Sequence, residues 1–218
     1  MIIELNNVSK TLGKRCVIDN ISIRIESEKV WGFKGVNGSG KTMLMRLICG
    51  LIKPDKGEVI IDGKVLWKDI SFPESVGILI EGPAFIDGMT GFQNLKTLAS
   101  IKNIISEDDI KTAMYDVGLD PLLNKKYKAY SLGMKQRLGI AAAIMEKPDI
   151  VLLDEPTNAL DTDGIELVKN LVDREKRRGA LVIVSCHDDE IINELADKII
   201  CLYEGRITEI RHVGGINE

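Results

Sequence analysis

Apolar and polar residues alternate near the start of the chain, over residues 2–5 and 21–25. Alternation with this period predicts the strands of a half-buried antiparallel sheet. Residues 12–15 are typical of a hairpin turn, and residues 57–64 carry two short strand signals around an Asp62-Gly63 turn. We therefore expect an antiparallel β layer that begins at the N-terminus and is completed after residue 57.

Unbroken apolar runs indicate a second kind of strand, over residues 30–33, 150–153 and 180–184. Such runs are typical of parallel strands that are buried on both faces. Residues 75–80 predict another strand, and residues 198–207 predict a hairpin that joins the sheet. The chain is therefore predicted to have an α/β fold around a mainly parallel sheet.

Helical signals lie between these strands. A helix is expected over residues 41–51, ending near Gly50. Residues 85–146 are predicted to be largely helical, because Ser106 and Asp109 resemble a capping box and because Ser131 precedes a long apolar helix that Pro148 closes. The first helix of this stretch is indicated by apolar residues at helical spacing: Phe92, Leu95, Leu98 and Ile101. We interpret residues 85–146 as an inserted α-helical subdomain.

Composition limits the function classes. The length of 218 residues suits one domain, residues 1–218, and the short polar tail after Arg211 predicts no regulatory domain there. No apolar run approaches the roughly 20 residues of a membrane span, and no signal peptide is evident, so we expect a cytosolic chain. The net charge of −4 gives no reason to expect a nucleic-acid partner.

The cysteines lack the C-x-x-C spacing of zinc or redox sites. We expect them to be reduced and mainly buried. They are Cys16, Cys49, Cys186 and Cys201.

Residues 35–42 match the pattern G-x-x-x-x-G-K-[ST], placed between a predicted strand and a predicted helix. Backbone N–H groups of such a loop surround a polyphosphate, and the helix N-terminus adds free donors. Lys41 can neutralise the β and γ phosphates, and the Thr42 hydroxyl suits Mg²⁺. A glycine-rich turn that happens to carry a lysine is the alternative. The candidate binding residues are Gly35, Asn37, Gly38, Ser39, Gly40, Lys41 and Thr42.

Acidic residues and a histidine follow the predicted central strands. Asp154 and Glu155 end the strand at residues 150–153, where one carboxylate can bind Mg²⁺ and the other can orient an attacking water. Glu81 and His187 follow two further strands, at the sheet edge where ligands bind in open α/β sheets. The alternatives are solvated acids before a proline and a structural histidine.

These motifs, in this order, resemble the ATP-binding subunits of ABC transporters over nearly the whole chain. The resemblance implies a P-loop, RecA-like core with an antiparallel β subdomain and an α-helical subdomain, binding ATP and Mg²⁺. It implies Asp154 as the Walker B acid, Glu155 as the catalytic base, His187 as the switch histidine and Asp161 as the D-loop acid. It also implies a head-to-tail homodimer or heterodimer in the ATP-bound state.

Three positions depart from the family pattern. The signature reads Tyr-Ser-Leu-Gly-Met over residues 130–134, keeping Ser131 and Gly133, which in the family cap the ATP of the other subunit. Glu81 replaces the glutamine of the Q-loop and is predicted to face Mg²⁺. In this feature the chain resembles transporters that export bacitracin-like and lantibiotic peptides. Leu12 falls where the family has an aromatic residue on adenine, and it cannot stack.

The favoured function is an ATPase subunit that energises a membrane transporter, with a transmembrane permease as its partner. The protein is then cytoplasmic and peripheral at the inner face of the membrane, which it contacts only through the permease. The alternative is a soluble ABC ATPase without a transport function. A small-molecule kinase would share the phosphate loop, but it gives no role to Ser131 or His187, and no acceptor lid is evident.

Overall fold

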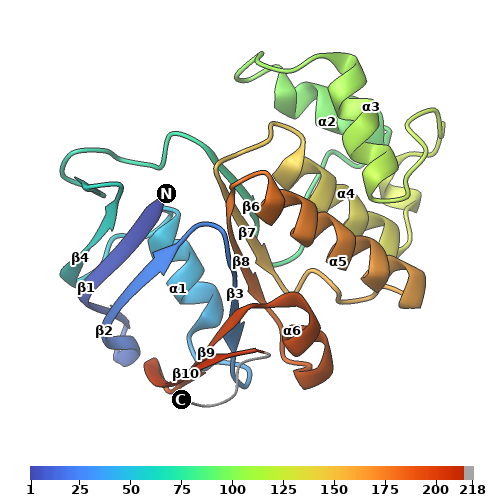
Figure 1. Cartoon of the computed structure of the whole chain (residues 1–218). Helices are drawn as coiled ribbons and strands as arrows, with labels where there is room; N and C mark the ends of the chain where they lie inside the picture. Colours follow the sequence, from blue (N-terminus) through green and yellow to red (C-terminus); the bar gives the residue numbers. More distant parts are fainter. Residues whose placement is uncertain (214–218) are drawn as a thin grey trace.

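A six-stranded sheet forms the centre of the computed structural model, which describes residues 1–213 (Figure 1). Its strand order is β10-β9-β3-β8-β7-β6, and all strands except β10 are parallel to their neighbours. The strands are β3 (Val30–Lys34), β6 (Val76–Leu79), β7 (Ile150–Asp154), β8 (Leu181–Ser185), β9 (Lys198–Tyr203) and β10 (Arg206–His212). The predicted central sheet and its closing hairpin are both present.

A four-stranded antiparallel sheet of order β2-β1-β4-β5 forms the second layer. Its strands are β1 (Ile2–Leu12), β2 (Arg15–Glu26), β4 (Lys56–Ile61) and β5 (Lys64–Val65). Helix α1 (Lys41–Ile48) packs against both β2 and β7. The predicted β layer is therefore present, and α1 joins it to the central sheet.

Three of the remaining helices, α4, α5 and α6, cover the opposite face of the central sheet, and α2 and α3 pack on each other and on α4. In Figure 1, α2 and α3 lie at the far end of the molecule from β1 and β2. Helix α4 packs against β6 and β7, whereas α5 and α6 pack against β8 and β3. These elements are α2 (Gly91–Ala99), α3 (Glu107–Asp116), the 3₁₀ turn η1 (Tyr127–Ala129), α4 (Leu132–Ile144), α5 (Thr162–Arg177) and α6 (Asp189–Leu195).

Strands β7 and β8 are buried along their whole length and serve two cores. Ile150 and Leu152 belong to the core shared with α1 and the antiparallel sheet. Val151 and Leu153 belong to the core shared with α4 and α5. Burial on both faces explains why the sequence of β7 is a continuous apolar run and shows no alternation of apolar and polar residues.

Local details differ from the sequence prediction. Helix α1 ends at Ile48, before the predicted residue 51, because Gly50 adopts φ 76° and ends the helix. Ile101 lies beyond the end of α2 and is 77% exposed, so its helical spacing was misleading. Cys16 is exposed on β2, whereas Cys49 and Cys186 are buried as expected.

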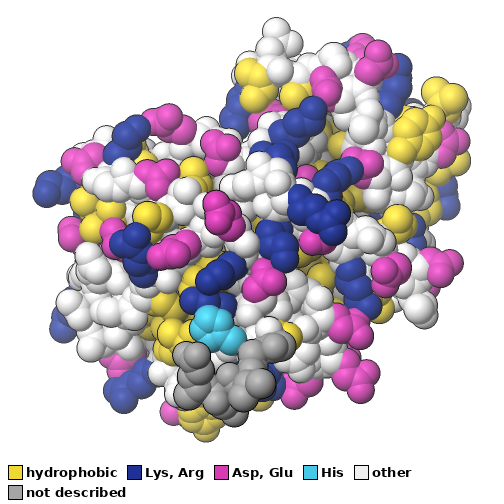
Figure 2. All heavy atoms as spheres, viewed as in Figure 1, with side chains coloured by type: hydrophobic (Ala, Val, Ile, Leu, Met, Phe, Trp, Pro, Cys, Tyr) yellow, Lys and Arg dark blue, Asp and Glu magenta, His cyan; other side chains and the backbone are white. Residues whose placement is uncertain are grey.

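Charged side chains of both signs are interspersed over the face shown in Figure 2, in keeping with the small net charge. Within residues 1–213, no helix is long and apolar enough to cross a membrane. The tail after Arg211 is predicted to carry no regulatory domain, and its residues 214–218 lie outside the described residues.

Candidate active site

The loop between β3 and α1 has the backbone conformation that its glycines predict. Gly40 precedes α1 with φ 112°, and a Cβ atom there would lie 3.0 Å from the Val17 carbonyl oxygen. A Cβ atom on Gly35 would lie 2.4 Å from the Leu202 carbonyl oxygen. Among residues 1–213 no side chain caps the start of α1, so its first N–H groups remain available to an anion.

Lys41 is 6% exposed and points back along this loop. Its Nζ atom donates a hydrogen bond to the Gly35 carbonyl oxygen at 2.7 Å and lies 3.7 Å from Oε1 of Glu155. Ser39 is buried, and its hydroxyl oxygen has no hydrogen-bond partner among the described residues. A buried ammonium group and an unpaired buried hydroxyl group both suit an anionic ligand with several oxygen atoms.

Thr42 and Asp154 meet at the base of the cavity, from α1 and the end of β7. The Thr42 hydroxyl donates to Oδ2 of Asp154 at 2.6 Å, and the Ser185 hydroxyl donates to Oδ1 of the same carboxylate. Oxygen donors of this kind suit Mg²⁺, which usually takes one or two carboxylates together with phosphate oxygens and water. Within the described residues no group of three or more His, Cys, Asp or Glu side chains could hold a metal ion. A Mg²⁺ ion here would therefore need nucleotide oxygens to complete its shell.

Glu155 begins the turn after β7 and is held in place from several directions. Its backbone adopts φ 50°, and its N–H group donates to the Ser185 hydroxyl at 3.0 Å. Its Oε2 atom lies 2.8 Å from Nδ1 of His187. Gln136, on α4, donates to the Glu155 carbonyl oxygen at 2.9 Å. Sequence reasoning missed Gln136, whose only signal is its place on a helix beside the signature residues.

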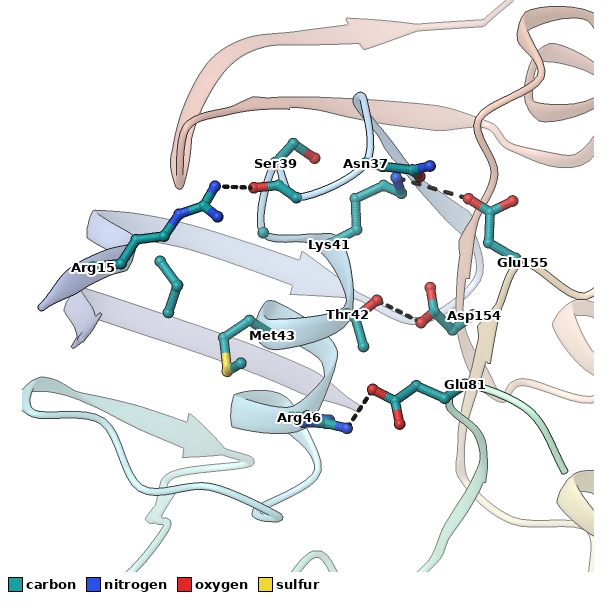
Figure 3. A pocket seen from close by; sticks show the side chains of 13 residues that line it. Arg15, Asn37, Ser39, Lys41, Thr42, Met43, Arg46, Glu81, Asp154 and Glu155 are labelled. Carbon is teal, nitrogen blue, oxygen red and sulfur yellow. Dashed lines mark hydrogen bonds and ion pairs between the residues drawn. The ribbon is translucent and has the colours of Figure 1, made fainter. Parts of the chain in front are cut away.

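Glu81 follows β6 and lies at the same sheet edge, but its carboxylate pairs with a residue that sequence reasoning missed. Oε1 of Glu81 lies 2.6 Å from Nη2 of Arg46, one helical turn after Thr42 on α1 (Figure 3). Glu81 was predicted to face Mg²⁺. In the structure it lines the cavity together with Thr42 and Asp154 while it is paired with Arg46.

The cavity has a volume of about 300 Å³ and gathers most of these groups (Figure 3). Arg15 and Val17 line one end of the cavity. Leu12, which falls where the family has an aromatic residue, is not among the described residues that line it. Of the predicted binding residues, its lining includes Asn37, Gly38, Ser39, Gly40, Lys41, Thr42, Glu81, Asp154 and Glu155. The structure therefore brings the phosphate loop and the predicted acids around one space.

Five predicted site residues are absent from this described lining. Gly35 accepts the hydrogen bond from Lys41 and His187 contacts Glu155, beside the cavity. The other three, Ser131, Gly133 and Asp161, lie at the starts of α4 and α5. Ser131 caps α4 by accepting a hydrogen bond from the Met134 N–H group at 3.2 Å, and Gly133 follows it in the first turn. Asp161 caps α5 and lies 2.9 Å from Arg137. The pKa of the Asp161 carboxyl lies below its usual value, mainly because it accepts the Gly164 N–H group and also because of the nearby Arg137 guanidinium.

A glycine-rich loop before a helix, a buried lysine, a Thr-Asp pair and an oriented glutamate define a P-loop nucleotide-hydrolysing protein. The family model described as "ABC transporter" matches residues 18–158. The chain belongs to this family and is an ABC ATPase, the ATP-binding subunit of a transporter.

Curated relatives agree with this assignment. An ABC transporter ATP-binding protein of Bacillus subtilis, YybJ, is 47% identical over 94% of both chains. The bacitracin transport ATP-binding protein BcrA of Enterococcus faecalis is 36% identical over 95% of this chain and 68% of its own. The lantibiotic transport ATP-binding protein SrtF of Streptococcus pyogenes is 33% identical over 94% of this chain and 89% of its own.

The fold is also similar to that of a solved dimeric bacterial ABC transporter cassette. That chain is 27% identical, with a TM-score of 0.88 over 98% of this chain and 100% of that chain. The predicted architecture of a P-loop core with added β and α parts is therefore confirmed.

Proposed function

We propose that this chain hydrolyses Mg²⁺-bound ATP with Glu155 as general base, and that it thereby drives a permease that exports peptide antibiotics. The observation that carries the catalytic part is the meeting of Lys41, Thr42, Asp154 and Glu155 around one cavity. The substrate class rests on the printed roles of two relatives, in bacitracin and lantibiotic transport.

The residues divide the chemistry between them. The α1 N-terminus and Lys41 hold the polyphosphate, while Thr42 and Asp154 would hold Mg²⁺. When bound, Mg²⁺ draws charge from the phosphate oxygens and so favours the transfer. Glu155 accepts the proton of the attacking water, as its carboxylate lies beside Lys41, where the γ phosphate would be held. His187 keeps that carboxylate oriented through the 2.8 Å contact with Oε2.

A second cassette would complete the site. Ser131 and Gly133 lie at the start of α4, and Asp161 lies at the start of α5. All three are absent from the described lining of the chain's own cavity. The N–H groups at the start of α4 can donate hydrogen bonds to a phosphate of the ATP that another chain binds. A head-to-tail dimer would present these groups to the partner's ATP. Both a homodimer and a heterodimer satisfy this geometry.

The permease would dock beside the segment that leads from Glu81 to Phe85, which connects the cavity to the helical part of the fold. Phe85 packs on Tyr127 in an edge-to-face arrangement, with ring centroids 5.4 Å apart. Tyr127 in turn donates to the Pro83 carbonyl oxygen at 2.6 Å. This connection supports a path by which nucleotide binding at Glu81 reaches the docking surface. The protein is then placed at the cytoplasmic face of the membrane.

The test is reconstitution with a candidate permease, chosen among the products of the neighbouring genes. Inverted vesicles that contain both proteins should take up bacitracin or a lantibiotic when ATP and Mg²⁺ are added, and Glu155→Gln should abolish uptake. Vesicles with the permease alone are the control. An ATPase-active chain that neither binds this membrane protein nor drives uptake would favour the alternative of a soluble ABC ATPase.

A further inference from the structure

Arg46 and Glu81 form an ion pair inside the nucleotide cavity that the proposed catalytic steps do not use. Nη2 of Arg46 lies 2.6 Å from Oε1 of Glu81, and both residues line the cavity (Figure 3). Arg46 follows Thr42 by one helical turn, so both side chains leave the same face of α1. The guanidinium therefore lies next to the place where Mg²⁺ would be held.

The backbone brings Glu81 to the same edge as Asp154. Strand β6 pairs in parallel with β7, with Leu79 opposite Leu153, so both strands end at one level of the sheet. Glu81 adopts φ 62°, a left-handed conformation that is uncommon for a residue with a side chain. Glu81 adopts this conformation where its carboxylate pairs with Arg46.

The two partners differ in freedom to move. The Arg46 side chain is 34% exposed and is rooted in α1, whereas the Glu81 side chain is 62% exposed and is rooted in a loop. Two residues later, Pro83 is held on both sides. Its carbonyl oxygen accepts a hydrogen bond from the Tyr127 hydroxyl. Its ring packs closely on Gly139, because a Cβ atom added to Gly139 would lie 2.8 Å from the Pro83 Cβ atom. Glu81 can therefore exchange partners, while the loop that holds it is anchored to α4 at Pro83.

We propose that Arg46 is a positioning residue for Glu81: it holds the carboxylate until the Mg²⁺ of a bound nucleotide replaces the guanidinium. This inference rests on the proposed function. A carboxylate oxygen that is engaged by Arg46 is less available to a metal ion, so Mg²⁺ and Arg46 compete for the same group. The competition sets the Mg²⁺ concentration at which ATP binds, and it ties metal occupancy to the position of the loop that leads to α4.

The test is a Mg²⁺ titration of ATP binding at equilibrium, without turnover, in wild type, Arg46→Met, Arg46→Lys and Glu81→Gln. Arg46→Met should lower the Mg²⁺ midpoint about twofold to fivefold, the range expected for an exposed ion pair. Arg46→Lys should restore a midpoint near that of wild type, since the charge remains. Glu81→Gln should raise the midpoint by at least about twofold, because a neutral amide replaces the carboxylate.

The double variant separates competition from a general effect of charge. If Arg46 acts only through Glu81, Arg46→Met with Glu81→Gln should match Glu81→Gln alone. Lys64→Met is the matched control, because Lys64 forms a 2.6 Å pair with Glu74 outside the cavity lining. That variant should leave the midpoint unchanged.

An unchanged midpoint in Arg46→Met, beside wild-type ATP binding, would overturn this inference and leave the proposed function standing. The inference would also be overturned if Arg46→Met shifted the Mg²⁺ midpoint by the same factor in the wild type and in Glu81→Gln. A wild-type chain that binds no ATP at any Mg²⁺ concentration would instead overturn the proposed function itself.

Discussion

Nζ of Lys41 lies 3.7 Å from Oε1 of Glu155, so the two groups assigned to phosphate and water face each other across the cavity. The same ammonium group donates to the Gly35 carbonyl oxygen. A polyphosphate that enters the loop must take over these contacts of Lys41. In the proposed mechanism, nucleotide binding exchanges the lysine's interaction with Glu155 for one with phosphate, and leaves the Glu155 carboxylate to act on water.

Lys41→Ala should lose nucleotide affinity. The variant removes the charged donor from the β and γ phosphates, and hydrogen bonds to charged groups contribute about 1.5–3 kcal/mol, which corresponds to about tenfold to a hundredfold in Kd. Isothermal titration with Mg²⁺-ATP measures this. Lys34→Ala is the matched control, since Lys34 pairs with Asp189 and is absent from the cavity lining. Unchanged affinity in Lys41→Ala would contradict its role.

His187→Ala should lower kcat and leave KM nearly unchanged. In the proposed mechanism the side chain orients Glu155 through the 2.8 Å contact, and the misplacement of a catalytic group can cost up to about a hundredfold in rate. His187→Asn keeps a side-chain hydrogen-bonding group and should lose less. Steady-state ATPase kinetics of the three proteins check this. A raised KM with normal kcat would place His187 in binding, against the orienting role.

The ATP-bound chain should dimerise when hydrolysis is blocked. Glu155→Gln with ATP and Mg²⁺ should elute as a dimer in size-exclusion chromatography with light scattering. Adding Ser131→Arg should return it to the monomer, because the larger side chain would block the start of α4 that faces the partner's ATP. Monomer in both proteins at high concentration would count against the sandwich arrangement.

Gly77→Ala should destabilise the fold without touching the site. A Cβ atom on Gly77 in β6 would lie 1.7 Å from the Ala143 carbonyl oxygen, so β6 or α4 must shift. Overpacking of this kind costs about 1–3 kcal/mol or more in the free energy of unfolding. Gly88→Ala, where nothing lies within 4 Å, is the control and should change stability by under about 0.5 kcal/mol. Urea unfolding of both variants decides the matter, and equal stabilities would contradict the packing of α4 on β6.

Much of the fold follows from local sequence signals. The capping box of Ser106 and Asp109 is present in α3, and Asp62 and Gly63 both adopt positive φ in the predicted hairpin turn. Apolar runs and turn residues act over a few positions, so the sequence alone shows them. Ile101 shows the limit, because helical spacing does not say where a helix ends.

The site is less complete in the sequence than the fold. The phosphate loop is predicted by its residue spacing and the Asp154–Glu155 pair by its place after an apolar strand, and the structure places both at one cavity. Arg46 beside Glu81 and Gln136 beside Glu155 were missed. These partners are far apart in the chain and meet only through the packing of α1 and α4 on the sheet, which no local period encodes.

We propose that Glu155 activates the attacking water in an ATPase site built by this chain. The most direct measurement compares single-turnover ATP hydrolysis by wild type and Glu155→Gln, with ATP affinity measured on the same samples. We expect hydrolysis by Glu155→Gln to be slower by a factor of about 10² or more, with ATP affinity retained. Normal turnover by Glu155→Gln would contradict it and remove Glu155 from the role of base.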